Sequence, residues 1–207
     1  MTKRPPNGLI LAGGKSSRMG SDKISLPFGS GTLLTRMLDR LAPQVTEVAV
    51  NGPPSLQLPK GVRHVPDTLP GQPGPLAGVL AGLRDLSSHR PDEVHLLTVP
   101  SDAPFFPEDL ARLLMSAASG PETVAIAASG GRAHPVFGLW PISLANDLEH
   151  WLRNSENRRM SDYLGRQQVV TVEWAMVSTT AGLLDPFMNL NTPEELGKAR
   201  RFLEILP

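Results

Sequence analysis

The sequence predicts an α/β fold in which helices cover both faces of a mostly parallel sheet. Short apolar runs typical of buried strands alternate along the chain with helical stripes, and the connections between them are short. The chain has 207 residues, 40% of them hydrophobic, which is enough for one sizeable core. We therefore expect residues 1–207 to form a single domain.

The first half of the chain is expected to begin with a strand and then to alternate. Residues 8–12 are all apolar or glycine, as in a buried strand. Residues 32–42 carry leucines and a methionine at i, i+4 and i+8, the spacing of a helix packed on a sheet. The other expected elements of this half are strands at 47–50, 61–65 and 94–99 and a helix that starts near Leu76.

Capping residues mark two helices of the second half. Pro107 and two acidic residues in the first turn predict a helix at 107–118. Thr192, Pro193 and Glu195 match an N-cap, a first-turn proline and a capping-box glutamate, so they start a final helix that runs to residue 206. The remaining expected elements are strands at 123–128, 135–140 and 169–174 and helices at 142–152 and 161–166.

The composition excludes several classes of partner and site. Twenty basic and twenty acidic residues give a formal charge of zero, which argues against nucleic acid or an anionic membrane as the main partner. The chain has no cysteine, and therefore no disulfide, thiolate metal site or thiol nucleophile. The N-terminal apolar run is too short for a signal sequence, and no run reaches the roughly 18 residues of a membrane span. We expect a soluble, cytoplasmic protein.

The stretch that follows the first strand is suited to bind phosphate. Paired glycines let backbone N–H groups approach an anion closely, and two cations follow them. The stretch does not match the full Walker A pattern Gly-x-x-x-x-Gly-Lys-Ser/Thr, and it does not contain the Gly-x-Gly-x-x-Gly of a dinucleotide site. A paired glycine alone is more often just a turn, so the prediction rests on the whole string. The candidate residues are Leu11, Ala12, Gly13, Gly14, Arg18 and Lys23.

This string resembles the nucleotidyltransferases that attach NMP to sugar phosphates or to molybdopterin. It is most similar to the molybdenum cofactor guanylyltransferases, which read Leu-Ala-Gly-Gly, Arg-Met-Gly and Asp-Lys at this place. The resemblance implies a Rossmann-like nucleotidyltransferase fold whose N-terminal half binds GTP and whose C-terminal half binds the acceptor. Further motifs match in the family's order at residues 50–51, 66–67, 73–78, 100–104, 134–135 and 189–195.

Four polar or glycine positions lie at or just after predicted strand ends, so they can converge on one crevice: Gly13, Asn51, Asp67 and Asp102. On position alone, Asp102 is equally well explained as a turn aspartate. The resemblance implies that it holds Mg²⁺, and that Lys23, Arg18 and Asp102 are the catalytic residues. It also implies GTP contacts at Asn51 and Asp67, where carboxylate or amide oxygens suit the N–H donors of guanine.

Candidates for the acceptor side are less distinctive. Arg158 and Arg159 suit an anionic pterin phosphate, and a solvated helix face explains them equally well. Asn189 and Asn191 either line the acceptor side or simply lead into the final helix. We expect His134 to be a packing or loop histidine, with no catalytic role.

The resemblance implies transfer of GMP from GTP to the terminal phosphate of molybdenum-molybdopterin, which yields a molybdopterin guanine dinucleotide and pyrophosphate. It implies GTP, the molybdenum cofactor and Mg²⁺ as ligands. It also implies two kinds of protein partner: proteins that deliver the cofactor and proteins that take part in the maturation of molybdoenzymes. Alternatives are cytidylyl transfer to the same cofactor, NMP transfer to a sugar phosphate, and a non-catalytic nucleotide or cofactor carrier. The close cytidylyl relatives tend to carry Asp-x-Asp-Thr-Pro where residues 189–193 read Asn-Leu-Asn-Thr-Pro, which favours guanine.

Overall fold

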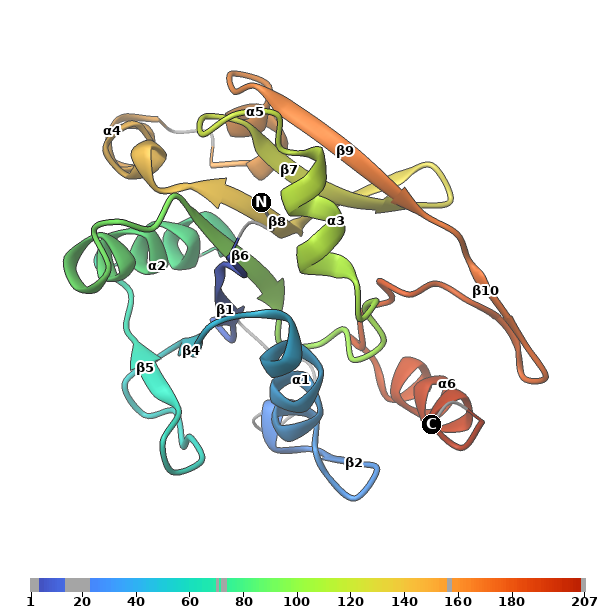
Figure 1. Ribbon diagram of the computed structural model, residues 1–207. Helices are drawn as coiled ribbons and strands as arrows, with labels where there is room; N and C mark the ends of the chain where they lie inside the picture. Colours follow the sequence, from blue (N-terminus) through green and yellow to red (C-terminus); the bar gives the residue numbers. More distant parts are fainter. Residues whose placement is uncertain (1–3, 14–22, 70, 72–73, 156–157, 206–207) are drawn as a thin grey trace.

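A computed structural model describes residues 4–13, 23–69, 71, 74–155 and 158–205. Its centre is a seven-stranded sheet of strand order β5-β4-β1-β6-β8-β7-β9 (Figure 1). The strands are β1 (Asn7–Leu11), β4 (Val48–Asn51), β5 (Arg63–Val65), β6 (His95–Pro100), β7 (Val124–Ser129), β8 (Arg132–Pro141) and β9 (Val169–Trp174).

The sheet is mostly parallel, which confirms the predicted fold class. Strands β5, β4, β1 and β6 are mutually parallel, and β9 is parallel to β7. Strand β8 runs antiparallel to both of its neighbours, β6 and β7. The beginning of β8 therefore lies on the side of the sheet where β6 ends. Side chains from the second half of the chain can therefore lie near the end of β6.

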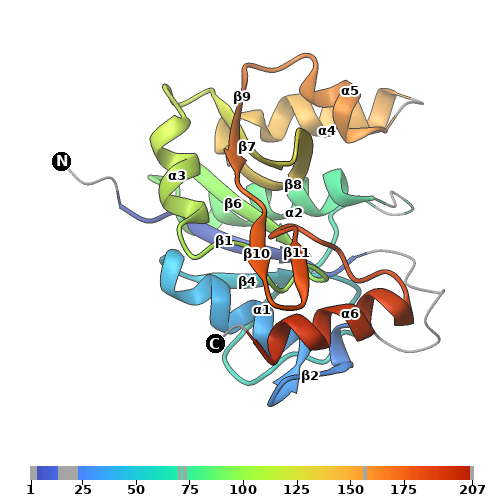
Figure 2. The same ribbon diagram turned by 90° about the vertical axis from the view of Figure 1, so that its right-hand side faces the viewer.

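Helices cover both faces of the sheet (Figure 2). On one face, α2 and α4 pack on side chains such as Leu9 and Leu96. On the other, α1 and α3 pack on the alternate residues, such as Ile10 and Leu97. The helices are α1 (Leu33–Leu41), α2 (Pro75–His89), α3 (Leu110–Ala117), α4 (Ala145–Asn154), α5 (Met160–Leu164) and α6 (Pro193–Leu203), with the 3₁₀ turns η1 (Lys23–Ser25), η2 (Ala42–Gln44) and η3 (Ile142–Leu144).

A third, smaller core fixes α6 to the N-terminal half. It joins Phe202 of α6 to Phe28 and Phe105, and the ring of Phe105 meets both others edge-on at centroid distances of 6.0 and 6.2 Å. This core holds the residues just before α6 close to the loop that follows β6. Two short hairpins flank it, β2–β3 (Pro27–Phe28 and Gly31–Thr32) and β10–β11 (Val177–Thr179 and Gly182–Leu184).

Most expected elements are present, and their boundaries differ for identifiable reasons. The helix expected at 107–118 begins at Leu110, after a turn. The helix expected at 142–152 begins as η3 and continues as α4. Strand β8 starts three residues earlier than expected, at Arg132, because the hairpin with β7 extends beyond its apolar part. Within the described part of the chain, no helix combines the length and apolarity needed to cross a membrane.

Candidate active site

Four parallel strands end at the same edge of the sheet, which we term the carboxyl edge. Leu11 pairs with Asn51 on one side and Pro100 on the other, and Asn51 pairs with Val65. The backbone continues this alignment beyond the strands, because Ala12 N–H donates to the Asn51 carbonyl at 2.8 Å. The loops carrying Gly13, Asp67 and Asp102 therefore leave the sheet side by side, as the sequence predicted.

A charged cluster lies at this edge. Lys23, at the start of η1, donates from Nζ to Asp102 Oδ2 at 2.6 Å and to Asn191 Oδ1 at 3.0 Å. Lys23 is only 9% exposed, although lysine is seldom buried unless it is paired. The ion pair joins the segment after the glycine stretch to the end of β6, and Asn191 adds the segment before α6.

Backbone bonds fix Asn191 in place. The amide of Leu190 donates to the carbonyl of Asp102 at 2.8 Å, and the amide of Asn191 donates to Glu195 Oε2 at 2.6 Å. Glu195 also closes the predicted capping box with Thr192. The cap that starts α6 thus also orients the asparagine that contacts Lys23.

Asn51 holds Asp67 at the same edge. Its side-chain nitrogen donates to the Val65 carbonyl at 3.0 Å and to Asp67 Oδ1 at 2.9 Å, so both of its amide hydrogens are used. Asn51 is 2% exposed, whereas Asp67 is exposed. The structure therefore presents the Asp67 carboxylate to solvent and keeps Asn51 behind it.

Gly78 is a site residue whose role the sequence motif alone did not reveal. A Cβ built on Gly78, in the first turn of α2, would lie 2.3 Å from Asn51 Oδ1 and 2.9 Å from Leu11 Cδ2. Asn51 can occupy its position only because residue 78 has no side chain. The motif at 73–78 marked this glycine, but its contact with Asn51 depends on how α2 packs on the sheet.

Gly78→Ala is expected to displace Asn51 and to release Asp67. Overpacking should lower the free energy of unfolding by about 1–3 kcal/mol, and nucleotide affinity should fall with it. Gly197→Ala in α6 is the matched control, because a Cβ there has no atom within 4 Å apart from its chain neighbours and the backbone of its own helix. The control should be neutral or stabilising by about 0.5–1 kcal/mol. Urea denaturation and nucleotide titration of both variants measure this, and equal behaviour of the two would refute the packing argument.

The other predicted site residues either lie away from the Lys23–Asp102 pair or fall outside the residues that the structure describes. Gly14 and Arg18 fall outside the described residues. Leu11 is buried in β1, so only its backbone is available to a ligand. Asn189 is exposed beside Asn191, whereas the exposed Arg158 and Arg159 lie between α4 and α5, on different elements from the Lys23 cluster. The structure thus joins Asn191, but not the two arginines, to the Lys23–Asp102 pair.

The donor set at the carboxyl edge fits a lightly coordinated cation. Among the described residues, no group of three or more His, Cys, Asp or Glu side chains comes together as a metal site. Asp102 offers one partly exposed carboxylate beside Lys23. Mg²⁺ commonly takes only one or two protein carboxylates and completes its shell with phosphate oxygens and water. Asp102 is therefore compatible with Mg²⁺ held mainly by a nucleotide.

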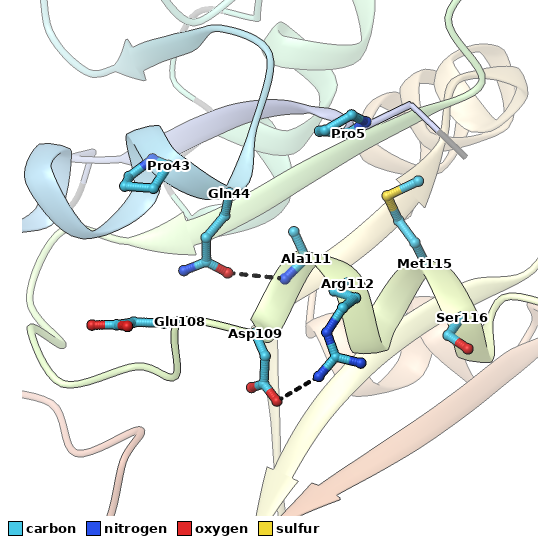
Figure 3. Close-up of a pocket in the computed structure, with 9 residues that line it drawn as sticks. All are labelled: Pro5, Pro43, Gln44, Glu108, Asp109, Ala111, Arg112, Met115 and Ser116. Atoms are coloured by element: carbon cyan, nitrogen blue, oxygen red, sulfur yellow. Dashed lines mark hydrogen bonds and ion pairs between the residues drawn. The ribbon is translucent and has the colours of Figure 1, made fainter. Parts of the chain in front are cut away.

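A separate cavity of about 590 Å³ lies between the N-terminal segment, η2 and α3 (Figure 3). Pro5 precedes β1, so this cavity is at the amino edge of the sheet, opposite the charged cluster. Gln44 Oε1 accepts from the Ala111 amide there at 3.1 Å, and Arg112 pairs with Asp109 at 3.0 Å. The lining residues are Pro5, Pro43, Gln44, Glu108, Asp109, Ala111, Arg112, Met115 and Ser116, none of which is a candidate site residue.

A family model and individual relatives point to the same protein family for this chain. Residues 8–170 match the family described as MobA-like NTP transferase domain. Proteins called molybdenum cofactor guanylyltransferase are 46% identical in Rhizobium meliloti (97% of this chain, 93% of the relative) and 47% identical in Rhizobium rhizogenes (98% and 93%).

Solved structures of low sequence identity share the fold. Molybdopterin-guanine dinucleotide biosynthesis protein A from Archaeoglobus fulgidus superposes with a TM-score of 0.73 at 19% identity, covering 96% of this chain and 98% of that one. A 4-diphosphocytidyl-2C-methyl-D-erythritol synthase from Anaerococcus prevotii gives 0.70 at 15% identity, covering 97% and 96%.

Proposed function

Because the chain belongs to the family of MobA-like NTP transferases, we propose that it transfers GMP from GTP to the terminal phosphate of molybdopterin. The products are pyrophosphate and a molybdopterin guanine dinucleotide. The activity for which the relatives are named supports this, and the cluster of Lys23, Asp102 and Asn191 is the structural observation that carries it. Proteins that deliver the cofactor or take up the product are the partners this function requires.

The N-terminal half is assigned to GTP and the C-terminal half to the acceptor. Gly13 and Asp67 follow β1 and β5, on one side of Asp102, and Asn191 comes from the segment before α6. Asp102 and Lys23 stand between these two groups and contact both halves of the chain. In this proposal the α-phosphate of GTP, which the phosphate of the acceptor must approach, binds beside Lys23 and Asp102.

Charge neutralisation is the main task of the site. The acceptor's phosphate monoester has a second pKa near 6, so it is largely ionised at neutral pH and requires no strong general base. Two anions must then approach each other. Lys23, together with Arg18 and the backbone amides of the glycine stretch, offsets this repulsion by binding phosphate oxygens.

Asp102 is assigned as the ligand of Mg²⁺. The bound ion supplies charge stabilisation at the phosphates. In the structure Lys23 donates to Asp102 Oδ2, so the ammonium group neutralises the carboxylate that the metal would use. Nucleotide binding then requires Lys23 to shift at least part of its bonding from Asp102 to phosphate oxygens.

Base selection is assigned to Asp67, with Asn51 as the residue that positions it. Guanine presents the adjacent N1–H and N2–H₂ donors, which one carboxylate can accept. Adenine presents an acceptor at N1, which a carboxylate lone pair repels. Because Asn51 donates both of its amide hydrogens within the protein, it acts through Asp67 in this proposal.

The protein is expected to bind GTP more tightly than ATP, CTP or UTP, and Asp67→Asn should remove most of this preference. Asparagine keeps an oxygen to accept the hydrogen bond from Asn51 but loses the negative charge. A hydrogen bond to a charged group contributes about 1.5–3 kcal/mol, which corresponds to about 10- to 150-fold in GTP affinity. Calorimetric titration of each nucleotide with Mg²⁺ measures it. If Asp67→Asn lowers all affinities equally, Asp67 contacts the ribose, and the base is read by other groups.

Two alternatives predict different results when this titration is combined with an assay of pyrophosphate release. Cytidylyl transfer predicts that CTP binds best. A non-catalytic carrier predicts tight nucleotide binding without pyrophosphate release. The pairing of Lys23 with Asp102 favours an enzyme, because a carrier has no need to hold a metal-ligating carboxylate beside a phosphate-binding cation.

A further inference from the structure

Three polar side chains from distant parts of the chain meet near the beginning of β8. Ser129 ends β7, His134 lies in β8 and Asp185 follows β11. Ser129 Oγ lies 2.8 Å from His134 Nε2 and 2.7 Å from Asp185 Oδ1. Ser129 is 2% exposed, so this contact is enclosed by the protein.

The direction of each hydrogen bond follows from the number of protons. A serine hydroxyl carries one hydrogen, and here it is donated to the Asp185 carboxylate. His134 Nε2 must therefore be protonated and donate to Ser129 Oγ. Burial lowers the pKa of His134 below 6.5 and Arg132 lowers it further, while Asp185 and Glu173 oppose this, so the histidine is neutral at pH 7 with its proton on Nε2.

The arrangement differs from that of a hydrolytic triad. Asp185 accepts from Ser129, and its other oxygen lies 4.0 Å from His134 Nε2, the nitrogen that already faces serine. In a nucleophilic triad the acid orients the opposite ring nitrogen, and the histidine accepts the serine proton. Here the serine proton is held by the acid, so Ser129 is not activated as a nucleophile.

Asp185 instead anchors the segment that leads to the charged cluster. Its Oδ1 also accepts from the Phe187 amide at 2.9 Å, and the Phe187 ring packs on His134 at a centroid distance of 5.0 Å. Three residues after Phe187, the Leu190 amide bonds to Asp102, and Asn191 then bonds to Lys23. The segment 185–191 is thus fixed to β7 and β8 at one end and to the charged cluster at the other.

We propose that Ser129, His134 and Asp185 are positioning residues that hold the segment 185–191 so that Asn191 reaches Lys23 and the acceptor side is formed. The assignment to the acceptor rests on the proposed function. The nucleotide side should be little affected, because Gly13 follows β1, Asn51 ends β4 and Asp67 follows β5. The three residues are not required to transfer a proton.

Two pairs of variants test this by steady-state kinetics with both substrates varied. The first pair removes hydrogen-bonding groups: Asp185→Ala removes the acceptor, and His134→Leu removes the donor. The second pair, Asp185→Asn and His134→Gln, retains them. The first pair should lose about 10- to 100-fold in kcat/KM for the acceptor, as expected for a misplaced group, with an unchanged KM for GTP. The second pair should stay within about threefold of the unmodified protein, since one hydrogen bond is replaced by another.

The pH dependence separates positioning from proton transfer. Both neutral Nε2–H and protonated histidine donate to Ser129, so the pH–rate profile of His134→Gln should match that of the unmodified protein. If His134→Gln is as impaired as His134→Leu and one ionisation disappears from the profile, His134 transfers a proton and the proposal is wrong.

Hydrogen exchange tests the anchor without any substrate. In Asp185→Ala, the amides of Phe187 and Leu190 should exchange at least about tenfold faster than in the unmodified protein, while amides in β1 and β4 stay unchanged. Unchanged exchange at both amides would overturn the proposal. If the unmodified protein shows no guanylyl transfer, the proposed function fails, and this exchange experiment still decides whether Asp185 fixes the segment.

Discussion

Asp102→Ala is expected to abolish guanylyl transfer while leaving the fold intact. The carboxylate is the proposed metal ligand, and metal-bridged charge stabilisation contributes several kcal/mol, so the rate should fall more than about a hundredfold. The fold should survive because Leu190 binds the backbone carbonyl of Asp102, which alanine retains. Pyrophosphate release at saturating GTP and Mg²⁺ measures the loss.

Matched variants isolate the charge of Asp102 from its size and place. Asp102→Asn keeps an oxygen that accepts from Lys23 but removes the negative charge, so it should be nearly as inactive as the alanine variant. Asp92→Ala removes an exposed aspartate just before the same strand, at the amino edge, and should be fully active. Near-normal turnover by Asp102→Asn would remove Asp102 from the metal site.

Lys23→Ala is expected to weaken GTP binding and to slow transfer. Loss of a charge-assisted contact costs about 1.5–3 kcal/mol, equivalent to about 10- to 150-fold. The substitution also leaves Asp102 without its ammonium partner and Asn191 without the donor to its Oδ1. Titration calorimetry with GTP and the rate of pyrophosphate release measure the two effects.

Lys60→Ala serves as the control. Lys60 is exposed in the turn before β5, and its substitution removes the same charge as Lys23→Ala. It should change neither quantity. The assignment of Lys23 would be wrong if Lys23→Ala had the GTP affinity and turnover of Lys60→Ala.

The fold could be predicted because its main signals are local. The apolar run of β1, the leucine stripe of α1 and the cap of α6 each lie within a dozen residues, and each formed as expected. The hairpins β2–β3 and β10–β11 were not foreseen. Strands of two or three residues are too short to show a period.

Only the part of the candidate site that lies at the ends of strands could be predicted from the sequence. Gly13, Asn51, Asp67 and Asp102 converge because parallel strands bring their carboxyl ends to one edge. The bond between Lys23 and Asn191 spans 168 positions, and that between Ser129 and Asp185 spans 56. Such contacts depend on how α6 and β11 pack, for which the sequence carries no local pattern.

Competition among the four nucleotides decides whether this chain joins GMP to molybdopterin. The protein is incubated with Mg²⁺, molybdopterin and equal concentrations of GTP, CTP, ATP and UTP, and the dinucleotide products are identified by mass spectrometry. We expect the guanine dinucleotide to dominate and its formation to match the amount of pyrophosphate released. A dominant cytosine dinucleotide, or tight GTP binding without any dinucleotide, would contradict it.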